Sequence, residues 1–100
     1  MRSRYTAYCL DLPDYIIATT HPGGPHWEPD LASWRESIRR FTDATRFEGL
    51  EVLEAREDGE RGEVTFRARL TQHGADASFT ERSTFVQHDG RWRYHSGKPA

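Results

Sequence analysis

Apolar side chains recur at helical spacing over the first twelve residues. The positions i, i+3, i+4 and i+7 of this pattern are Tyr5, Tyr8, Cys9 and Leu12. The spacing predicts a helix over residues 1–12 that buries these four side chains on one face. Pro13 suits the first turn of a second helix, which we expect over residues 13–20.

A loop and a third helix follow. Three prolines and two glycines between residues 21 and 29 predict the loop. Asp30 is a suitable N-cap for a helix that we expect to end near Phe41. The apolar stripe of this helix comprises Leu31, Trp34, Ile38 and Phe41. Trp27 is unusual for a loop residue, and we expect it either to anchor the loop or to belong to a lid over a site.

From residue 47 onward the apolar spacing changes to the two-residue period of β-strands. Strands are predicted over residues 47–56, 63–73, 77–88 and 91–95, and residues 97–100 are expected to form a frayed tail. Asp89-Gly90 lies between the last two strands and is a strong signal for a hairpin turn.

Helices followed by an antiparallel meander predict one α+β domain over residues 1–100. We expect the N-terminal helices to pack on a curved, mostly antiparallel four-stranded sheet, so that the two layers form a cone. The aromatic side chains of the last two strands are expected to line this cone. Its concave interior is the expected place for a ligand, because pockets favour concave apolar sites with a few polar groups.

Composition narrows the function classes. The chain has 14 basic and 16 acidic residues and a net charge of -2, which is no general reason to expect a nucleic acid or an anionic membrane as partner. No apolar run approaches the length of a transmembrane helix, and the first residues lack the apolar core of a secretory signal.

Cys9 is the only cysteine, so neither an intramolecular disulfide nor a cysteine-based zinc site is available to this chain. We expect Cys9 to be a small buried side chain in a cytoplasmic protein. The histidines have no metal-ligand spacing, and no metal or cofactor is expected. A basic stripe is expected on the outer sheet face, although the acidic total argues against nucleic acid; its members are Arg67, Arg69, Arg91 and Arg93.

Glu81 is the main candidate for chemistry. It shares a strand face with Phe79 and Phe85, so a cone lined by these rings would hold a carboxylate among aromatic side chains. Such a carboxylate is a candidate general base or acid. The alternative, which we prefer, is a structural ion pair between Glu81 and Arg2 or Arg4 of the first helix.

His21, next to Pro22, is a candidate second proton carrier. The alternative is a ring that bonds a backbone carbonyl and holds the loop. Tyr5 and Tyr8 are candidate pocket hydroxyls, although a core position is the simpler interpretation. The residues expected to bind or flank a ligand are Arg2, Arg4, Tyr5, Tyr8, Trp27, Arg82 and Tyr94.

Several segments together resemble the bacterial YchJ-like proteins. These are MRSRYTAY at the start, HP at 21–22, FEGLEVL at 47–53, GEVTFRA at 62–68, ERSTF at 81–85 and DGRWRYHSG at 89–97. The resemblance implies the cone-shaped fold of the nuclear transport factor 2 (NTF2) type, in a family without an assigned activity. Longer members carry cysteine-rich SEC-C segments that bind zinc. This chain departs from that pattern because its one cysteine matches no metal cluster. Either it is a short form of the family or the flanking segments lie elsewhere, and the zinc of the longer members is not expected here.

Two functions are compatible with these observations. The first is an accessory module that binds a small molecule or a protein in the cone, with a homodimer as one way to cover a sheet face. The alternative is a cofactor-free isomerase or hydratase that uses Glu81 and His21, with Tyr8 or Arg4 holding an oxyanion. An open cavity with Glu81 free of arginine would favour the enzyme, and a sealed ion pair would favour the module.

Overall fold

The computed structural model describes residues 1–100 and confirms three N-terminal helices. They are α1 (Arg2–Cys9), α2 (Pro13–Ala18) and α3 (Leu31–Ala44). Pro13 occupies the first turn of α2. The side chain of Asp30 caps α3 by accepting a hydrogen bond from the backbone N–H of Ser33, as predicted. None of the helices is long and apolar enough to cross a membrane.

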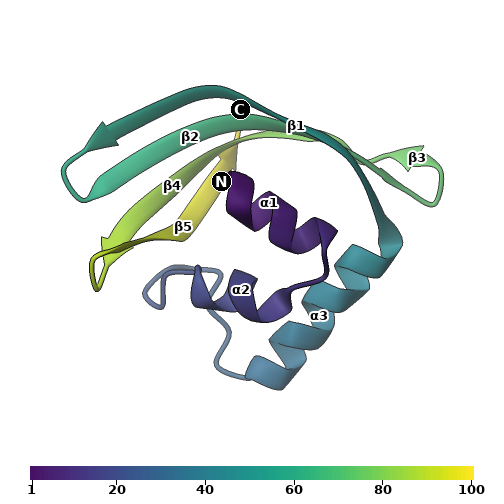
Figure 1. Ribbon diagram of the computed structural model, residues 1–100, viewed down its shortest axis with the longest axis horizontal. Helices are drawn as coiled ribbons and strands as arrows, with labels where there is room; N and C mark the ends of the chain where they lie inside the picture. Colours follow the sequence, from purple (N-terminus) through teal and green to yellow (C-terminus); the bar gives the residue numbers. More distant parts are fainter.

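The C-terminal half forms one antiparallel sheet that arches over the helices (Figure 1). Its strands are β1 (Thr45–Asp58), β2 (Arg61–Gln72), β3 (Ala75–Asp76), β4 (Phe79–His88) and β5 (Arg91–Pro99). The order is β1-β2-β4-β5, and the short β3 pairs with β2. The α+β prediction is therefore confirmed, with a fifth strand that the alternation did not indicate because it is two residues long.

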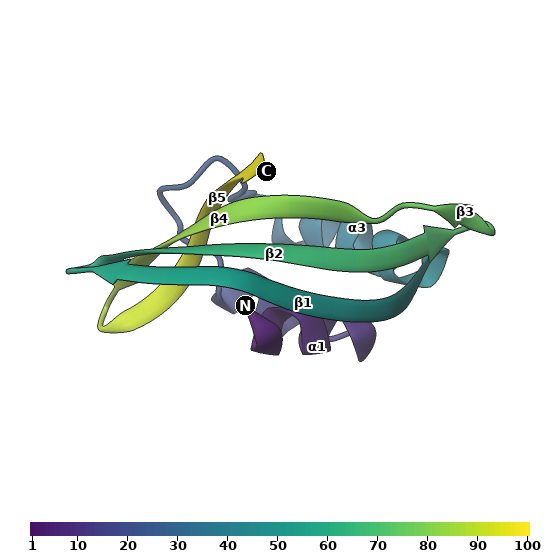
Figure 2. The same cartoon turned by 90° about the horizontal axis from the view of Figure 1, so that it is seen from above.

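The predicted frayed tail is wrong, because β5 continues to Pro99. Gly97 pairs with Ser83 and Lys98 pairs with Arg82 of β4, so residues that lack a strand-like sequence are held by backbone hydrogen bonds of their neighbour. In the view from above, β1, β2 and β4 run side by side (Figure 2).

Irregular pairing bends the sheet around the helices. The β1–β2 register shifts between Phe47 and Gly49 and again between Val52 and Glu54. A third shift lies in the β4–β5 pair at Thr84/Phe85. Bulges of this kind bend a strand and increase its twist, which gives the concave face seen in Figure 1.

Local turn chemistry sets the hairpins. Asp89 and Gly90 have φ values of 54° and 75°, the left-handed pair that a type I′ turn requires, which confirms the predicted hairpin. His73 and Gly74 have φ values of 52° and 79° and form the β2–β3 turn, so the strand predicted over residues 63–73 ends one residue earlier, at Gln72.

The buried face of α1 differs from the prediction. Arg4 and Ala7 are its buried residues, whereas Cys9 is exposed and Leu12 is 48% exposed. Tyr5 and Tyr8 of the predicted stripe do pack against the core, but Cys9 and Leu12 do not, and the expectation of a buried cysteine was wrong. Ala7 belongs to the core between the helices, where its small side chain lets α1 approach; the other members are Ile16, Ile17, Trp34 and Ile38. A second core cluster lies on β2 and comprises Phe66, Ala68 and Leu70, which confirms the predicted alternation.

Candidate functional site

A cavity of about 360 Å³ lies between the helices and the concave face of the sheet. We call it the inner cavity. Most of its lining is apolar or aromatic, including Phe41, Phe47, Phe66, Phe79 and Trp34. Its polar lining comprises Arg4, Tyr5, Tyr8, Thr20, His26, Ser37, Glu81, Ser83 and Tyr94. An apolar cavity with a few convergent polar groups is the usual form of a small-molecule site.

Glu81 enters the inner cavity from β4, where it pairs in register with Phe66 of β2. Its Oε2 accepts hydrogen bonds from Ser83 Oγ at 2.6 Å and from the Tyr94 hydroxyl at 3.3 Å. None of the ion pairs within 4.0 Å includes Glu81, so the expected clamp to Arg2 or Arg4 is wrong. The clamp fails because Arg2 is exposed and Arg4 bonds to α2 instead.

Gly97 makes room for the Glu81 carboxylate. A Cβ atom built on Gly97 would lie 2.4 Å from Glu81 Cδ and 2.5 and 2.7 Å from its two oxygens. Only a glycine lets the carboxyl group lie so close to the backbone of β5. The carboxylate of Glu81 therefore occupies the space that a side chain at Gly97 would need.

Arg4 is 7% exposed and carries a buried charge at the boundary of the inner cavity. Its Nη1 donates to the carbonyl oxygen of Ile16 at 3.1 Å, to Thr19 Oγ1 at 2.7 Å and to Thr20 Oγ1 at 3.3 Å. Its Cζ lies 4.7 Å from the centroid of the Tyr94 ring, a cation–π distance. Burial lowers the pKa of Arg4, and the nearby tyrosines and Glu81 oppose that effect.

The tyrosine hydroxyls of the inner cavity stay protonated at neutral pH. Burial raises the pKa of Tyr94, and the negative charge of Glu81 raises it further. Burial also raises the pKa of Tyr8, while Arg4 lowers it in part. Glu81 is therefore surrounded by neutral hydroxyl donors rather than by cationic side chains.

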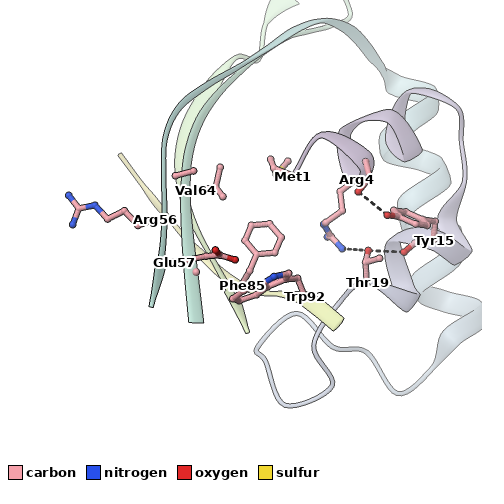
Figure 3. A pocket seen from close by; sticks show the side chains of 12 residues that line it. Met1, Arg4, Tyr15, Thr19, Arg56, Glu57, Val64, Phe85 and Trp92 are labelled. Carbon is pink, nitrogen blue, oxygen red and sulfur yellow. Dashed lines mark hydrogen bonds between the residues drawn. The ribbon is translucent and has the colours of Figure 1, made fainter. Parts of the chain in front are cut away.

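A second hollow of about 410 Å³ lies beside the inner cavity, between α1–α2 and the sheet. We call it the outer groove. Its apolar lining includes Met1, Ala55, Val64, Phe85 and Trp92. Figure 3 shows Arg4 extending from the helical side toward Phe85, with a hydrogen bond to Thr19, whereas Arg56 points away from the groove. Arg4 and Met1 line both hollows, so these two side chains form part of the wall between them.

His21 lines neither the inner cavity nor the outer groove. Its Nδ1 accepts a hydrogen bond from the backbone N–H of Gly23 at 2.9 Å, so the ring bonds an amide and not the carbonyl that we expected. The ring centroid lies 5.1 Å from that of His88 and 5.4 Å from that of His95. Across the molecule, no group of three or more His, Cys, Asp or Glu side chains is arranged to hold a metal ion.

The pKa of His21 should be measurable by NMR titration below the ordinary value of 6.5. The largest cause is desolvation, followed by His88, His95 and Arg93, all of which disfavour the charged ring. Because the unfolded chain binds this proton more readily, His21 should contribute stability above pH 6.5 that is lost as the pH falls from there toward the folded-state pKa.

The matched variants for this titration are His88→Gln and His73→Gln. His88→Gln should raise the pKa of His21 toward its ordinary value, whereas His73→Gln, in the exposed β2–β3 turn, should leave the titration unchanged. A wild-type pKa at or above 6.5 would contradict the geometry of this histidine cluster.

The other predicted site residues are divided between the cavity and the surface. Tyr5 lines the inner cavity and contacts Phe47 edge to face at 5.8 Å. Trp27 contacts Trp34 at 5.2 Å and lines neither hollow, an arrangement that fits the anchoring role, and the lid stays a prediction. Arg82 is exposed beside the charged side chains of Glu54, Arg56 and Glu63, apart from Glu81. The expected basic stripe is interrupted, because Arg93 Nη1 donates to the carbonyl oxygen of Ala18.

Several residues that shape the site were missed in the sequence. Ser83 is fully buried and donates to Glu81, and Thr19 and Thr20 hold Arg4. His26 lines the inner cavity with its ring 5.4 Å from that of Tyr94. Of the residues that shape the site, only Gly97 could have been noticed in the sequence, because a glycine inside a strand often marks a place where another group approaches the backbone closely.

Comparison with known proteins identifies relatives over the full length of the domain. The matching family model is described as YchJ, middle NTF2-like domain, and it covers residues 1–97. A UPF0225 protein of Chromobacterium violaceum is 39% identical over 102 residues, which cover 97% of this chain and 69% of the relative. A UPF0225 protein of Enterobacter sp. (strain 638) is 34% identical over 99 residues, covering 97% of this chain and 62% of the relative. The chain thus spans roughly two thirds of the length of these curated relatives.

A solved structure agrees with the fold. The solution structure of RPA3114, a SEC-C motif containing protein from Rhodopseudomonas palustris, superposes with a TM-score of 0.81 at 36% identity. The match covers 100% of this chain and 75% of that protein.

Proposed function

The chain belongs to the YchJ family through its middle NTF2-like domain, and from that premise we propose that it is an accessory module that binds a small molecule in its inner cavity. The motif resemblance to this family is confirmed by the family model. Because the similar protein RPA3114 contains a SEC-C motif, we propose that the module works beside such a segment in longer relatives. Fold alone does not select a ligand, so the proposal rests on the site.

The observation that carries the proposal is the unused acceptor capacity of Glu81. Both of its hydrogen bonds go to Oε2, and no cationic side chain lies within 4.0 Å of either oxygen. A carboxylate among aromatic rings is costly unless its oxygens accept hydrogen bonds. A ligand with an N–H or O–H donor directed at Oε1 would supply one, while its apolar part would contact the rings of Phe66 and Phe79.

The test is a ligand screen by NMR and thermal shift on the wild type and on Glu81→Gln. Hits should perturb resonances of Phe66 and Tyr94 and raise the melting temperature by mass action. Loss of a charge-assisted hydrogen bond should weaken their binding to Glu81→Gln by about tenfold or more.

The matched control is Glu63→Gln, which neutralises a carboxylate in the charged patch beside Arg82 and should leave the affinity unchanged. The proposal fails if no compound perturbs the inner cavity, or if Glu81→Gln binds the hits as tightly as the wild type does.

The same samples test the second candidate, a cofactor-free isomerase or hydratase with Glu81 as base. A Glu81 without an arginine partner in a cavity is the arrangement that we expected to favour this enzyme. Its support is the pairing of a carboxylate with the Tyr94 hydroxyl, a base and a hydrogen-bond donor, in one apolar cavity. His21 lies outside this cavity, so Tyr8 takes its place as the nearby proton donor in this version. A catalytic Glu81 should exchange a carbon-bound proton of a bound ligand with deuterium from the solvent, and Glu81→Gln should not. If no hit exchanges a proton with deuterium, the enzyme candidate is rejected and the binding module remains.

A further inference from the structure

We propose that the outer groove is a second binding site, for an organic carboxylate whose anionic head pairs with Arg4 and whose apolar body lies against Val64, Phe85 and Trp92. This site is distinct from the Glu81 site of the inner cavity, although Arg4 borders both hollows. The ligand class follows from three features: an arginine without a counter-ion, the charges that surround it, and the shape of the apolar walls.

Arg4 is more than nine-tenths buried and has no carboxylate within 4.0 Å. All of its hydrogen bonds within 3.5 Å come from Nη1, so Nε and Nη2 have no acceptor within that distance. The Tyr8 hydroxyl nevertheless lies close enough to Arg4 for the arginine to offset part of the rise that burial causes in the pKa of Tyr8. The side-chain polar atoms that are sealed from solvent without a partner are Thr42 Oγ1 and Arg93 Nε, so the nitrogens of Arg4 that make no hydrogen bond keep some solvent access. Nε and Nη2 together form the fork that binds a carboxylate through two parallel hydrogen bonds.

The surrounding charges direct an anion to the outer groove. In the inner cavity an anionic ligand would meet Glu81, which is itself without a cationic partner. In the outer groove the acidic residue is Glu57, which is exposed and therefore screened by water and salt. Arg56 does not compete for the ligand, because its Nε is paired with Glu54 at 2.7 Å and its side chain points away from the groove (Figure 3).

The walls of the groove suit a flat apolar body. Phe85 and Trp92 face the helical side from β4 and β5, and Val64 lies above them on β2 (Figure 3). The Trp92 ring lies against β2 at Gly62, where a Cβ atom would be in ordinary van der Waals contact with it at 3.5 Å. A volume of about 410 Å³ is within the range of ligand pockets and accommodates a bicyclic aromatic acid.

The experiment uses three probes of matched shape, naphthalene-2-carboxylate, naphthalene-2-carboxamide and 2-naphthylmethylammonium, titrated into the isotope-labelled chain and followed by NMR. The carboxylate should shift resonances of Val64, Phe85 and the Trp92 indole, and it should bind about tenfold tighter than the carboxamide because its bonds to Arg4 are charge-assisted. The ammonium probe should bind most weakly. Added salt should weaken the carboxylate and not the carboxamide.

Three variants locate the head and the body of the probe. Arg4→Lys keeps the charge but loses the fork, and it should reduce the preference for the carboxylate over the carboxamide by several fold. Because Arg4 also supports α2, the second variant is Ala55→Trp, which fills the groove from an exposed position, leaves Arg4 itself unsubstituted and should abolish binding. Its control is Thr65→Trp, beside the charged patch, which should bind normally.

Glu81→Gln separates the two sites. It should leave the affinity of the carboxylate within about twofold, whereas a probe seated in the inner cavity would bind tighter once the repelling charge is removed. The inference is overturned by equal binding of carboxylate and carboxamide, by shifts centred on Phe66 and Leu70, or by no binding of any probe at millimolar concentration. None of these results bears on ligands that bind Glu81 in the inner cavity. Conversely, a failure to find such ligands would not contradict the site in the outer groove.

Discussion

Replacement of Arg4 with alanine should lower the free energy of unfolding by about 3 kcal/mol, whereas Arg2→Ala should change it by less than about 0.5 kcal/mol. The two arginines are two positions apart in α1, but Arg2 is exposed and Arg4 is 7% exposed. Arg4→Ala removes the donor to Ile16 O, Thr19 and Thr20 and also the side chain that fills the space beside the Tyr94 ring. Urea denaturation followed by circular dichroism measures both variants.

A third variant separates packing from hydrogen bonding. Arg4→Met keeps much of the side-chain volume, and Thr19 and Thr20 keep their own hydrogen bonds to Tyr15 O and Ile16 O, so no hydroxyl is left without a partner. Its loss of stability should therefore be smaller than that of Arg4→Ala, by about 1 kcal/mol or more. Similar small losses for Arg2→Ala and Arg4→Ala would show that Arg4 does not join α1 to α2.

The substitution Gly97→Ala should destabilise the fold by about 2 kcal/mol, the cost of overpacking at a close contact. The new methyl group would overlap the Glu81 carboxyl group, with its Cβ atom 2.4 Å from Glu81 Cδ. Glu81 would have to move and would lose its bonds to Ser83 and Tyr94. A loss of stability would be informative, since replacing a glycine inside a strand with alanine otherwise leaves the free energy of unfolding unchanged or raises it.

A double-mutant cycle with Glu81→Ala isolates this contact. When the carboxyl group is absent, Gly97→Ala should cost less than about 0.5 kcal/mol, which gives a coupling free energy above about 1 kcal/mol. The four proteins are compared by chemical denaturation. An equal cost of Gly97→Ala in both backgrounds would mean that Glu81 does not lie against the backbone of β5.

The parts of the fold that depend on local chemistry were predictable. Asp30 caps α3 because its side chain needs only the backbone N–H of Ser33, three residues away. Asp89-Gly90 turns the chain because these residues tolerate positive φ. The alternation of Phe66, Ala68 and Leu70 identified the buried face of β2, since side chains of a strand point to opposite faces in turn.

The errors concern contacts between segments far apart in the chain. The pattern in α1 placed Cys9 in the core, whereas the helix buries Arg4 because acceptors of α2 are within reach of its guanidinium. The end of β5 has no strand-like sequence and is ordered by pairing with β4. His21 and Glu81 were grouped as catalytic candidates, but the loop that carries His21 leaves its ring beside His88 and His95, outside the cavity.

The sequence by itself determined the order of helices and strands, the family and the presence of Glu81 on the aromatic face of β4. These follow from periodicity, turn residues and motifs, which act over a few neighbouring positions. Only the tertiary structure decided that Glu81 binds Ser83 and Tyr94 and that Arg4 is left without a counter-ion at the wall between two hollows. The partner of a buried charged side chain is whichever suitable group the packing of the helices against the sheet brings within 4 Å. That packing joins segments far apart in the chain, so no local pattern of residues encodes the partner.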